Sequence, residues 1–325
     1  MNAIVKALLK AVALAAMAVV APVGAQEYPA KPVRLVVPHA TGTPIDILSR
    51  ALATRLGTEL GQSVLVDVKP GASGTVGAVD VLRQPNDGYT LLVVDMPMSV
   101  AQTIYANVPF KLGKDFAPIG QFGAFYNVLV VHPSVKANSA GELAALLKQQ
   151  PGKLSFSSGG PGTPAHIAGE LFKLRTSTSA LHVPYNQFPQ AIADLLGGQN
   201  QFMFAATPPV VPHINAGKLR ALAVTSPERI SALKEIPTMS EAGFPDFVVR
   251  TWLGLVVKAG APADVVVAKV NAALGRVLQA EDVKATYAKL GTDVIGGSPE
   301  AFGSLIEAET SRWAAVAKAA NLKVD

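Results

Sequence analysis

The amino-acid sequence predicts an α/β protein with two lobes that face a shared cleft. Short apolar, β-rich runs alternate with amphipathic helical stretches, and this alternation begins twice, near residue 33 and near residue 127. Loops rich in Gly, Ser, Thr and Pro separate the runs, which is typical of strand–helix–strand units with a parallel sheet. Hydrophobic residues make up 50% of the 325-residue chain, so each unit can form its own core.

The first 25 residues have the three parts of a cleavable signal peptide. Lys6 and Lys10 form a basic start, residues 11–23 are almost wholly apolar, and small residues at 23–25 offer a cleavage site. A transmembrane anchor is the alternative, but the apolar stretch is shorter than the roughly 20 residues of a spanning helix. We therefore expect export to the bacterial periplasm.

The first unit begins with a short apolar strand that Pro38 ends. In the helix that follows, apolar side chains at positions 48, 51, 52 and 56 recur at helical spacing. The expected elements are a strand at 33–37, a helix at 46–56, a strand at 64–68, a helix at 76–82 and a strand at 89–94.

The second unit repeats this alternation. Ser139 is a candidate cap for its first helix, and the loop at 158–164 opens its second. The expected strands are at 128–131, 154–157, 201–205, 219–224 and 248–257, and the expected helices are at 141–148, 165–174, 191–196, 263–278 and 299–319.

Composition and motifs exclude several classes of function. The chain has no Cys, which rules out disulfides, Cys-ligated metals, a cysteine nucleophile and a lipid-modified cysteine. A formal charge of +5, spread along the chain, is too small for a nucleic-acid surface. The sequence has no nucleophile elbow, no P-loop and no paired metal-binding histidines. We therefore expect no enzymatic activity, no metal and no cofactor.

Three loops, at 39–46, 71–75 and 158–164, lie where a strand ends and a helix begins. Their glycines let the backbone approach a ligand, and the free N–H groups of a helix start favour an anion. Such loops in both halves of the chain indicate an anion site, with ordinary capped turns as the alternative. Hydroxyl groups that can add hydrogen bonds are those of Thr43, Ser73, Ser158 and Thr163.

Several side chains near these loops have a structural as well as a ligand-binding interpretation. Asp46 is either a helix cap or a ligand contact, because the helix dipole favours a carboxylate there. His166, in the first turn of its helix, either donates to a bound anion or is structural. Tyr185 either reaches the cleft or packs in the core, and Trp252 is expected in the core or at a hinge.

The mature chain carries a series of ordered motifs at Tyr28–Pro38, Pro70–Gly74, Asp87–Leu92, Asp115–Ile119, Val128–Ser134, Gly162–Phe172, His182–Tyr185, Asp194–Gln199, Ala216–Thr225, Ile236–Thr238 and Glu241–Gly243. Together they resemble the Bug/TctC family, the periplasmic receptors of tripartite tricarboxylate transporters. The resemblance covers essentially the whole mature chain.

The resemblance implies a type II periplasmic-binding-protein fold, in which two crossing strands join two α/β lobes. It implies a first lobe of residues 26–125 and 247–325 and a second lobe of residues 126–246, with crossings near 124–127 and 245–251. In the family, the loops that correspond to 39–46 and 158–166 hold a ligand carboxylate, partly through ordered water. The ligand-binding residues expected here are His39, Thr41, Gly42, Thr43, Ile45, Asp46, Ser73, Ser158, Gly159, Gly160, Gly162, Thr163, His166, Tyr185, Phe188 and Ala205.

This sequence departs from the family's usual text at positions that bear on the ligand. The first loop keeps one of three glycines, and Ile45 occupies a position that carries a hydroxyl in relatives. Phe188 adds a second apolar side chain, and Ala205 stands where relatives often have Asp. Because alanine cannot pair with an ammonium group, we expect a dicarboxylate or an aromatic, terephthalate-like acid. An amino acid is the less favoured alternative.

The resemblance also implies partners for this chain. They are a small organic acid and the integral-membrane large and small subunits of a tripartite tricarboxylate transporter. We expect a monomer that closes around its ligand by hinge motion. The alternative is a sensory receptor that passes a carboxylate signal to a membrane kinase, since the same fold serves both roles.

Overall fold

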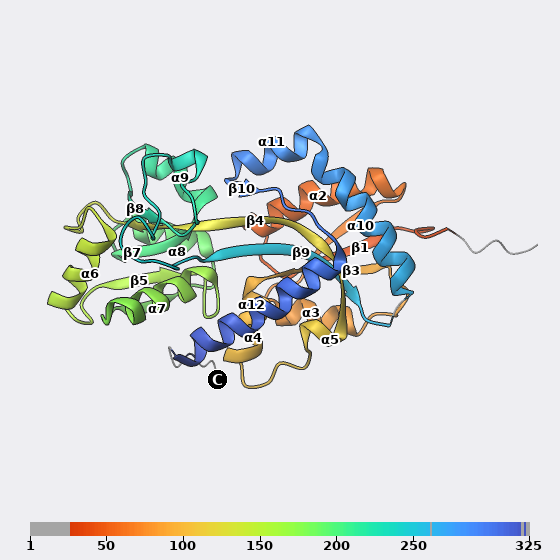
Figure 1. Ribbon diagram of the computed structural model, residues 1–325, viewed down its shortest axis with the longest axis horizontal. Coiled ribbons are helices and arrows are strands. Elements are labelled where there is room, and N and C mark those ends of the chain that lie inside the picture. The colour runs from red at the N-terminus through yellow and green to blue at the C-terminus, as the bar shows by residue number, and fades with distance from the viewer. Residues whose placement is uncertain (1–26, 261, 320–321, 323–325) are drawn as a thin grey trace, which may run out of the picture.

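Two groups of strands, joined by two long crossing strands, organise the chain (Figure 1). The computed structural model describes residues 27–260, 262–319 and 322, so the predicted signal peptide lies outside the described residues. Within this part of the chain, no helix has the length and apolar character needed to span a bilayer. The arrangement confirms the predicted two-lobed α/β class.

The first lobe is built on three parallel strands in the order β2-β1-β3. Four of the five residues of β1 are buried, as expected for a strand that helices cover on both faces. The strands are β1 (Val33–Val37), β2 (Val64–Val68) and β3 (Thr90–Asp95). The helices are α2 (Pro44–Leu60), α3 (Thr75–Leu82), α4 (Met96–Ile104), α5 (Leu112–Asp115), α10 (Ala263–Gln279), α11 (Glu281–Lys289) and α12 (Pro299–Ala319).

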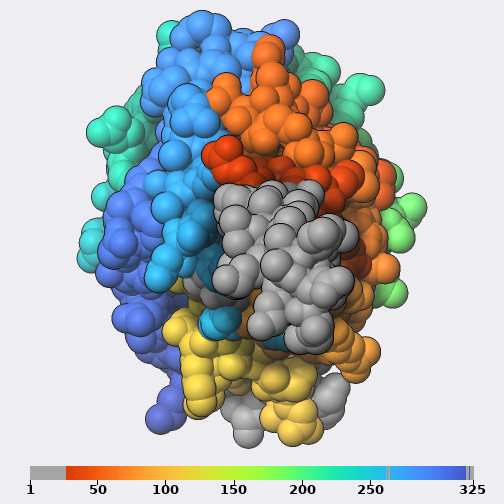
Figure 2. All heavy atoms as spheres, turned by 90° about the vertical axis from the view of Figure 1, so that its right-hand side faces the viewer, coloured from red at the N-terminus to blue at the C-terminus, as the bar shows by residue number. Residues whose placement is uncertain are grey.

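Helices α10 and α11, near the C-terminus, return to this lobe and pack on its first helix, α2. Figure 2 shows α10, in light blue, beside α2, in orange. Ion pairs at this contact join Arg276 to Glu59 at 2.5 Å and Arg55 to Asp282 at 2.7 Å. Residues from both ends of the chain therefore form one lobe.

The second lobe has the strand order β8-β4-β7-β5-β6. The strands β6, β5 and β7 run parallel to one another, and β4 runs antiparallel to β7 and β8. Its own strands are β5 (Ser155–Ser158), β6 (Leu181–Pro184), β7 (Phe202–Ala206) and β8 (Arg220–Val224). Its helices are α6 (Ala140–Gln149), α7 (Pro164–Thr176), α8 (Phe188–Leu196) and α9 (Thr207–Asn215).

The crossing strands are β4 (Phe116–Val131) and β9 (Arg250–Lys258). β4 pairs with β9 as far as Tyr126, and from Asn127 onward it pairs with β7 and β8 of the second lobe. The short strand β10 (Thr292–Asp293) pairs with β4 in the first lobe. β4 thus changes lobe between residues 126 and 127, and the numerical lobe boundaries given above stay predictions.

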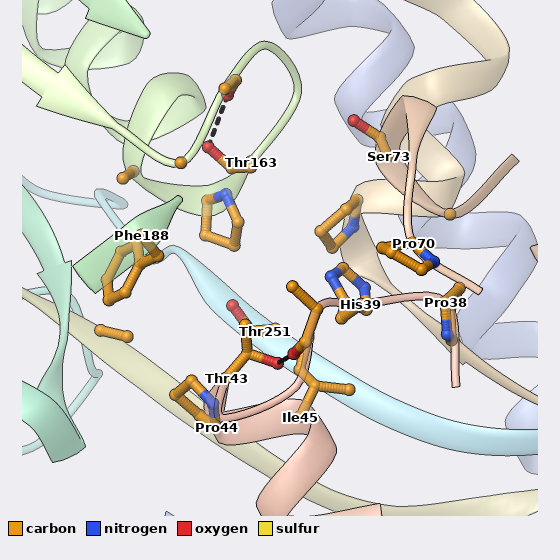
Figure 3. A pocket seen from close by; sticks show the side chains of 18 of the residues that line it. Pro38, His39, Thr43, Pro44, Ile45, Pro70, Ser73, Thr163, Phe188 and Thr251 are labelled. Atoms are coloured by element: carbon orange, nitrogen blue, oxygen red, sulfur yellow. Dashed lines mark hydrogen bonds between the residues drawn. The ribbon is translucent and has the colours of Figure 1, made fainter. Parts of the chain in front are cut away.

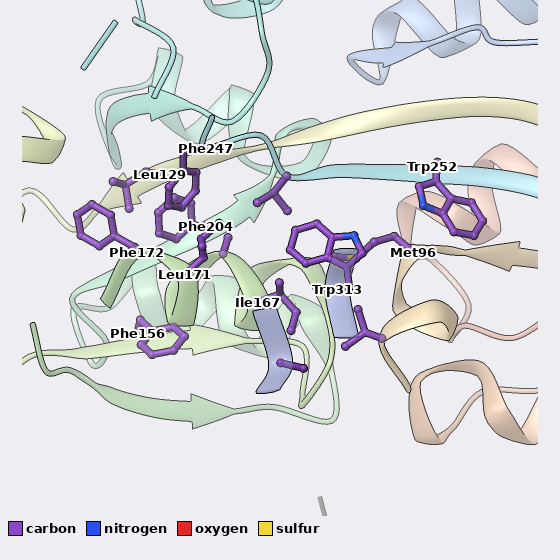
Figure 4. Close-up of a cluster of buried hydrophobic side chains, with 14 of the residues drawn as sticks. Met96, Leu129, Phe156, Ile167, Leu171, Phe172, Phe204, Phe247, Trp252 and Trp313 are labelled. Atoms are coloured by element: carbon purple, nitrogen blue, oxygen red, sulfur yellow. The ribbon is translucent and has the colours of Figure 1, made fainter. Parts of the chain in front are cut away.

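Aromatic side chains fill the core on both sides of the crossing (Figure 4). In the second lobe, Phe204 stacks on Phe247 with ring centroids 5.5 Å apart, and Phe172 packs against both rings. In the first lobe, Trp252 of β9 is fully buried and meets the ring of Phe302 edge-on. Trp252 is therefore a core residue, one of the two places expected for it.

Candidate functional site

A cavity of about 280 Å³ lies between the two lobes (Figure 3). Residues 38–40, 43–45 and 70–74 of the first lobe face residues 159–161 and 163–165 of the second lobe across it. The crossing strands β4 and β9 form its floor. A ligand in this cavity would therefore touch both lobes and the strands that join them.

The wall of the cavity is largely apolar. Ile45 and Phe188 face it from opposite lobes. Among the described residues that line it there is no Asp, Glu, Lys or Arg, and His39 and Tyr105 are the titratable side chains. Recognition of charge therefore falls on backbone dipoles and on His39. The prolines of the wall are Pro38, Pro44, Pro70, Pro97, Pro161 and Pro164.

Two loops with the same Gly-Thr-Pro sequence open the helices α2 and α7 at this cavity. Thr43 and Thr163 have nearly equal backbone angles, with φ −72° and −68° and ψ 156° in both. The Thr43 hydroxyl donates to Ala40 O at 2.9 Å, and the Thr163 hydroxyl donates to Gly160 O at 2.7 Å. Proline at the first helical position has a backbone φ already suited to the helix.

The side chain at the third helical position reaches back to the glycine in both loops. Gly42 N donates to Asp46 Oδ2 at 2.9 Å, and Gly162 N donates to His166 Nδ1 at 3.1 Å. These bonds occupy the two glycine amides. At the second helical position, the N–H groups of Ile45 and Ala165 have no hydrogen-bond partner among the described residues.

Both helix starts therefore offer free donors to the same space. Ile45 and Ala165 line the cavity, one from each lobe. A helix start carries about half a positive elementary charge, which stabilises a nearby anion. The arrangement can hold a carboxylate between the lobes without a cationic side chain.

The predicted ligand residues divide into two sets. Those that line the cavity are His39, Thr43, Ile45, Ser73, Gly159, Gly160, Thr163 and Phe188. Those outside the lining are Thr41, Gly42, Asp46, Ser158, Gly162, His166, Tyr185 and Ala205. Direct ligand contact by any of them stays a prediction.

Several residues outside the lining support the site through hydrogen bonds or core packing. Ser158 is fully buried, lies 2.7 Å from His182 Nε2 and accepts a hydrogen bond from Gly160 N at 3.1 Å. The Tyr185 hydroxyl donates to Asp194 Oδ2 at 2.7 Å, which ties it to α8. Ala205 is fully buried in the core of the second lobe, and its neighbour Ala206 lines the cavity because side chains alternate along a strand.

His166 and His182 stack behind the second loop with ring centroids 4.1 Å apart. Burial, together with the neighbouring His182 and Lys173, lowers the pKa of His166 to about 3. Burial also lowers the pKa of His182 to about 4, with Lys173 contributing. His166 is therefore neutral near pH 7, and its Nδ1 can accept the Gly162 N–H.

A direct hydrogen bond joins the lobes across the mouth of the site. Ser73 Oγ donates to Pro161 O at 2.8 Å. Ser73 and its neighbour Ala72 have positive φ angles of 49° and 46°, a conformation that side chains rarely adopt. At Gly162 an added Cβ would lie 2.7 Å from Ile104 Cδ1, which shows how closely the lobes approach.

The sequence-based prediction missed the polar residues on the floor of the cavity. Asn127 and Thr251 line it, and within the described part of the chain their Oδ1 and Oγ1 atoms are buried without a hydrogen-bond partner. Asn127 Nδ2 donates to Phe204 O at 2.6 Å, which fixes the amide. The available signal was a lone amide directly before the apolar run 128–131.

A family model described as the tripartite tricarboxylate transporter family receptor, TctC, matches residues 48–322. The chain belongs to the TctC family. BugT of Bordetella pertussis (strain Tohama I) is 34% identical to it over 96% of this chain and 96% of BugT. TctC proteins are periplasmic solute-binding proteins and not enzymes, and this chain is one of them.

Solved structures with about 30% sequence identity to this chain have the same fold. The periplasmic binding protein BugD is 32% identical, with a TM-score of 0.83 over 91% of this chain and 99% of BugD. Rpa4515 of R. palustris, solved with adipate, is 30% identical, with a TM-score of 0.85 over 91% of this chain and 99% of that chain. These matches confirm the predicted periplasmic-binding-protein architecture.

Proposed function

We propose that this TctC protein captures a small organic dicarboxylate or aromatic carboxylate and delivers it to the membrane subunits of a tripartite tricarboxylate transporter. The observation that carries this proposal is the pair of matched helix starts, one from each lobe, at one cavity. Their free amides supply donors for one carboxylate group. Export through the N-terminal signal peptide is part of the proposal.

The chemistry of the wall supports an acid without an ammonium group. The described lining contains no carboxylate that could neutralise an ammonium group. On β7, Ala206 lines the cavity and its neighbour Ala205 does not. Ile45 and Phe188 offer apolar contact to a methylene chain or a ring. Adipate, the ligand of Rpa4515, has this character.

Closure of the lobes couples capture to delivery in this proposal. A carboxylate that bonds to helix starts of both lobes has more contacts in the closed form than in the open form. The ligand therefore shifts the population towards the closed form, which the membrane subunits then recognise.

A thermal-shift series on the mature protein tests the ligand class. We expect adipate or terephthalate to raise the melting temperature, because a ligand that binds only the folded state stabilises it by mass action. Aspartate and glutamate serve as the ammonium-bearing controls. Stabilisation by these amino acids, with none by the diacids, would contradict the proposed class.

A transport assay tests delivery. Membrane vesicles that carry the large and small subunits should accumulate labelled ligand only when the loaded receptor is added. Equal uptake with and without the receptor would contradict the transporter role and leave ligand capture intact.

A further inference from the structure

His39 is the one side chain in the described lining of the cavity that can carry a positive charge. It follows Pro38 directly after β1, so the end of a buried strand positions it. Figure 3 shows its ring in the cavity wall close to Pro38. Any cationic contact from the lining to a bound ligand therefore comes from this imidazole.

Asp95 holds the ring of His39 from behind. Asp95 ends β3, is fully buried, and caps α4 by accepting a hydrogen bond from Met98 N on its Oδ1 at 3.2 Å. Its Oδ2 bonds to His39 Nε2. In the part of the chain that the structure describes, His39 is the one ion-pair partner of this carboxylate.

The position of Asp95 has an energetic consequence for His39. A buried carboxylate without a positive or hydrogen-bonding partner strongly destabilises the folded state. Both oxygens of Asp95 are occupied, one by a backbone amide and one by the imidazole. The bond to Asp95 therefore fixes the orientation of the ring.

The second ring nitrogen, Nδ1, is left for a ligand. It has no hydrogen-bond partner among residues 27–260, 262–319 and 322, and it is not one of the buried polar atoms without a partner. The His39 side chain is 17% exposed. Because Nε2 is bound to Asp95, Nδ1 is the ring nitrogen left for a ligand in the cavity that His39 lines.

We propose that His39, oriented by Asp95, is the residue that makes this protein select a diacid over a monoacid. The proposal rests on the proposed function, in which the helix starts hold the first carboxylate of the ligand. With a proton on each nitrogen, the imidazole donates Nε2–H to Asp95 and Nδ1–H to the second carboxylate. Hydrogen bonds between charged groups are about twice as strong as neutral ones. This contact therefore favours a diacid, which has a second carboxylate, over a monoacid, which has none.

Calorimetry with a matched pair of six-carbon acids, adipate and hexanoate, tests the proposal on the mature protein. We expect the wild type to bind adipate more tightly than hexanoate. His39→Phe keeps a ring of similar size but removes the donor, so it should weaken adipate binding about tenfold or more and leave hexanoate within about twofold.

Asp95→Asn provides a second variant that is expected to fold, because asparagine is also a good helix cap. It should lower adipate affinity and leave hexanoate affinity unchanged, since Asp95 is outside the described lining and affects the ligand through His39. His213→Phe, on α9 and outside the described lining, is the matched control and should leave both affinities unchanged.

Three outcomes would overturn the proposal: equal weakening of both acids by His39→Phe, no effect of that variant, or tighter adipate binding by Asp95→Asn. A wild type that binds hexanoate as tightly as adipate would also overturn it, yet would leave carboxylate capture intact. Failure of every tested carboxylate to bind would overturn the proposed function as well.

Discussion

The loops at 40–46 and 160–166 have the same backbone conformation but differ in the side chain that accepts a hydrogen bond from the glycine N–H. Each sets Gly-Thr-Pro before a helix, and each returns the side chain of the third helical residue to the glycine amide. The first lobe uses Asp46, a buried carboxylate that also binds Arg50 Nε at 2.9 Å. The second lobe uses His166, a buried imidazole stacked on His182.

This difference teaches that the two helix starts are not equivalent for an anion. Asp46 places a carboxylate in the first turn of α2, where it opposes a second anion, and the half-exposed Arg50 offsets this charge only in part. Neutral His166 satisfies the amide of Gly162 without adding charge to α7. The comparison predicts that the second-lobe loop binds the ligand carboxylate more strongly than the first-lobe loop does.

The largest expected effect is the response of His166 to acid. Its pKa is about 3 in the folded protein and near 6.5 in an unfolded chain, so protonation favours unfolding. Below about pH 6.5 the fold should lose about 1.4 kcal/mol per pH unit from this group until the folded pKa is reached. Between about pH 6.5 and pH 4.5 the loss is about 2–3 kcal/mol.

The variant His166→Asn isolates this contribution, because the asparagine Oδ1 can accept the Gly162 N–H in place of Nδ1. Urea unfolding at about pH 7 and about pH 4.5 should show a smaller acid loss for the variant than for wild type. His213→Asn is the control and should keep the wild-type difference. An unchanged difference in His166→Asn would show that this imidazole does not govern acid stability.

The next largest effect is the difference between alanine substitutions at the two loop glycines, Gly162 and Gly42. Gly162 and Gly42 have φ angles of 77° and 82°, so alanine costs each about 1 kcal/mol of stability. Only at Gly162 does an added Cβ meet the other lobe, at Ile104 and Ser73. Overpacking of this kind costs about 1–3 kcal/mol, so Gly162→Ala should weaken ligand binding about tenfold.

Gly42→Ala is the matched control for that measurement, since an added Cβ there has nothing within 4 Å among the described atoms. Calorimetry should find its affinity within about twofold of wild type. Equal loss of affinity in both variants would mean that backbone strain, and not lobe contact, controls binding.

The smallest effect concerns the bond from Ser73 to Pro161 O. Ser73→Ala removes one hydrogen bond of about 1 kcal/mol that is made only when the lobes are close. We expect an apparent affinity about fivefold lower and a larger radius of gyration for the unliganded protein by X-ray scattering. Ser134→Ala, at an exposed turn of the second lobe, should change neither quantity.

Sequence patterns predicted most regular elements because their local signals agree with the fold. β1 and β2 lie at the predicted residues, and α2 extends the predicted helix by a capped first turn and by a last turn that ends at Gly61. The loops at 39–46 and 158–164 do precede helices, as predicted, since Gly, Thr and Pro before an amphipathic helix are local signals. Their binding of an anion stays a prediction.

Elements whose signals conflict were missed. The first part of β4 contains Pro118, Gly120 and Gly123, which disfavour a strand, and the pairing shifts register at these positions. α4 and α9 contain prolines near their starts, and α9 has a further proline inside. Tertiary pairing and burial override these local preferences.

By itself, the sequence determined the α/β class, the family and the chemistry of the loops, because these depend on periodicity and on motifs of neighbouring residues. The tertiary structure alone decided that His39 meets Asp95 and that Ser73 meets Pro161. It also decided that Asn127 and Thr251 both lie on the floor of the cavity. These pairs are far apart in the chain. The parallel pairing of β1 with β3 brings His39 to Asp95, and the packing of two lobes about β4 and β9 brings the other pairs together.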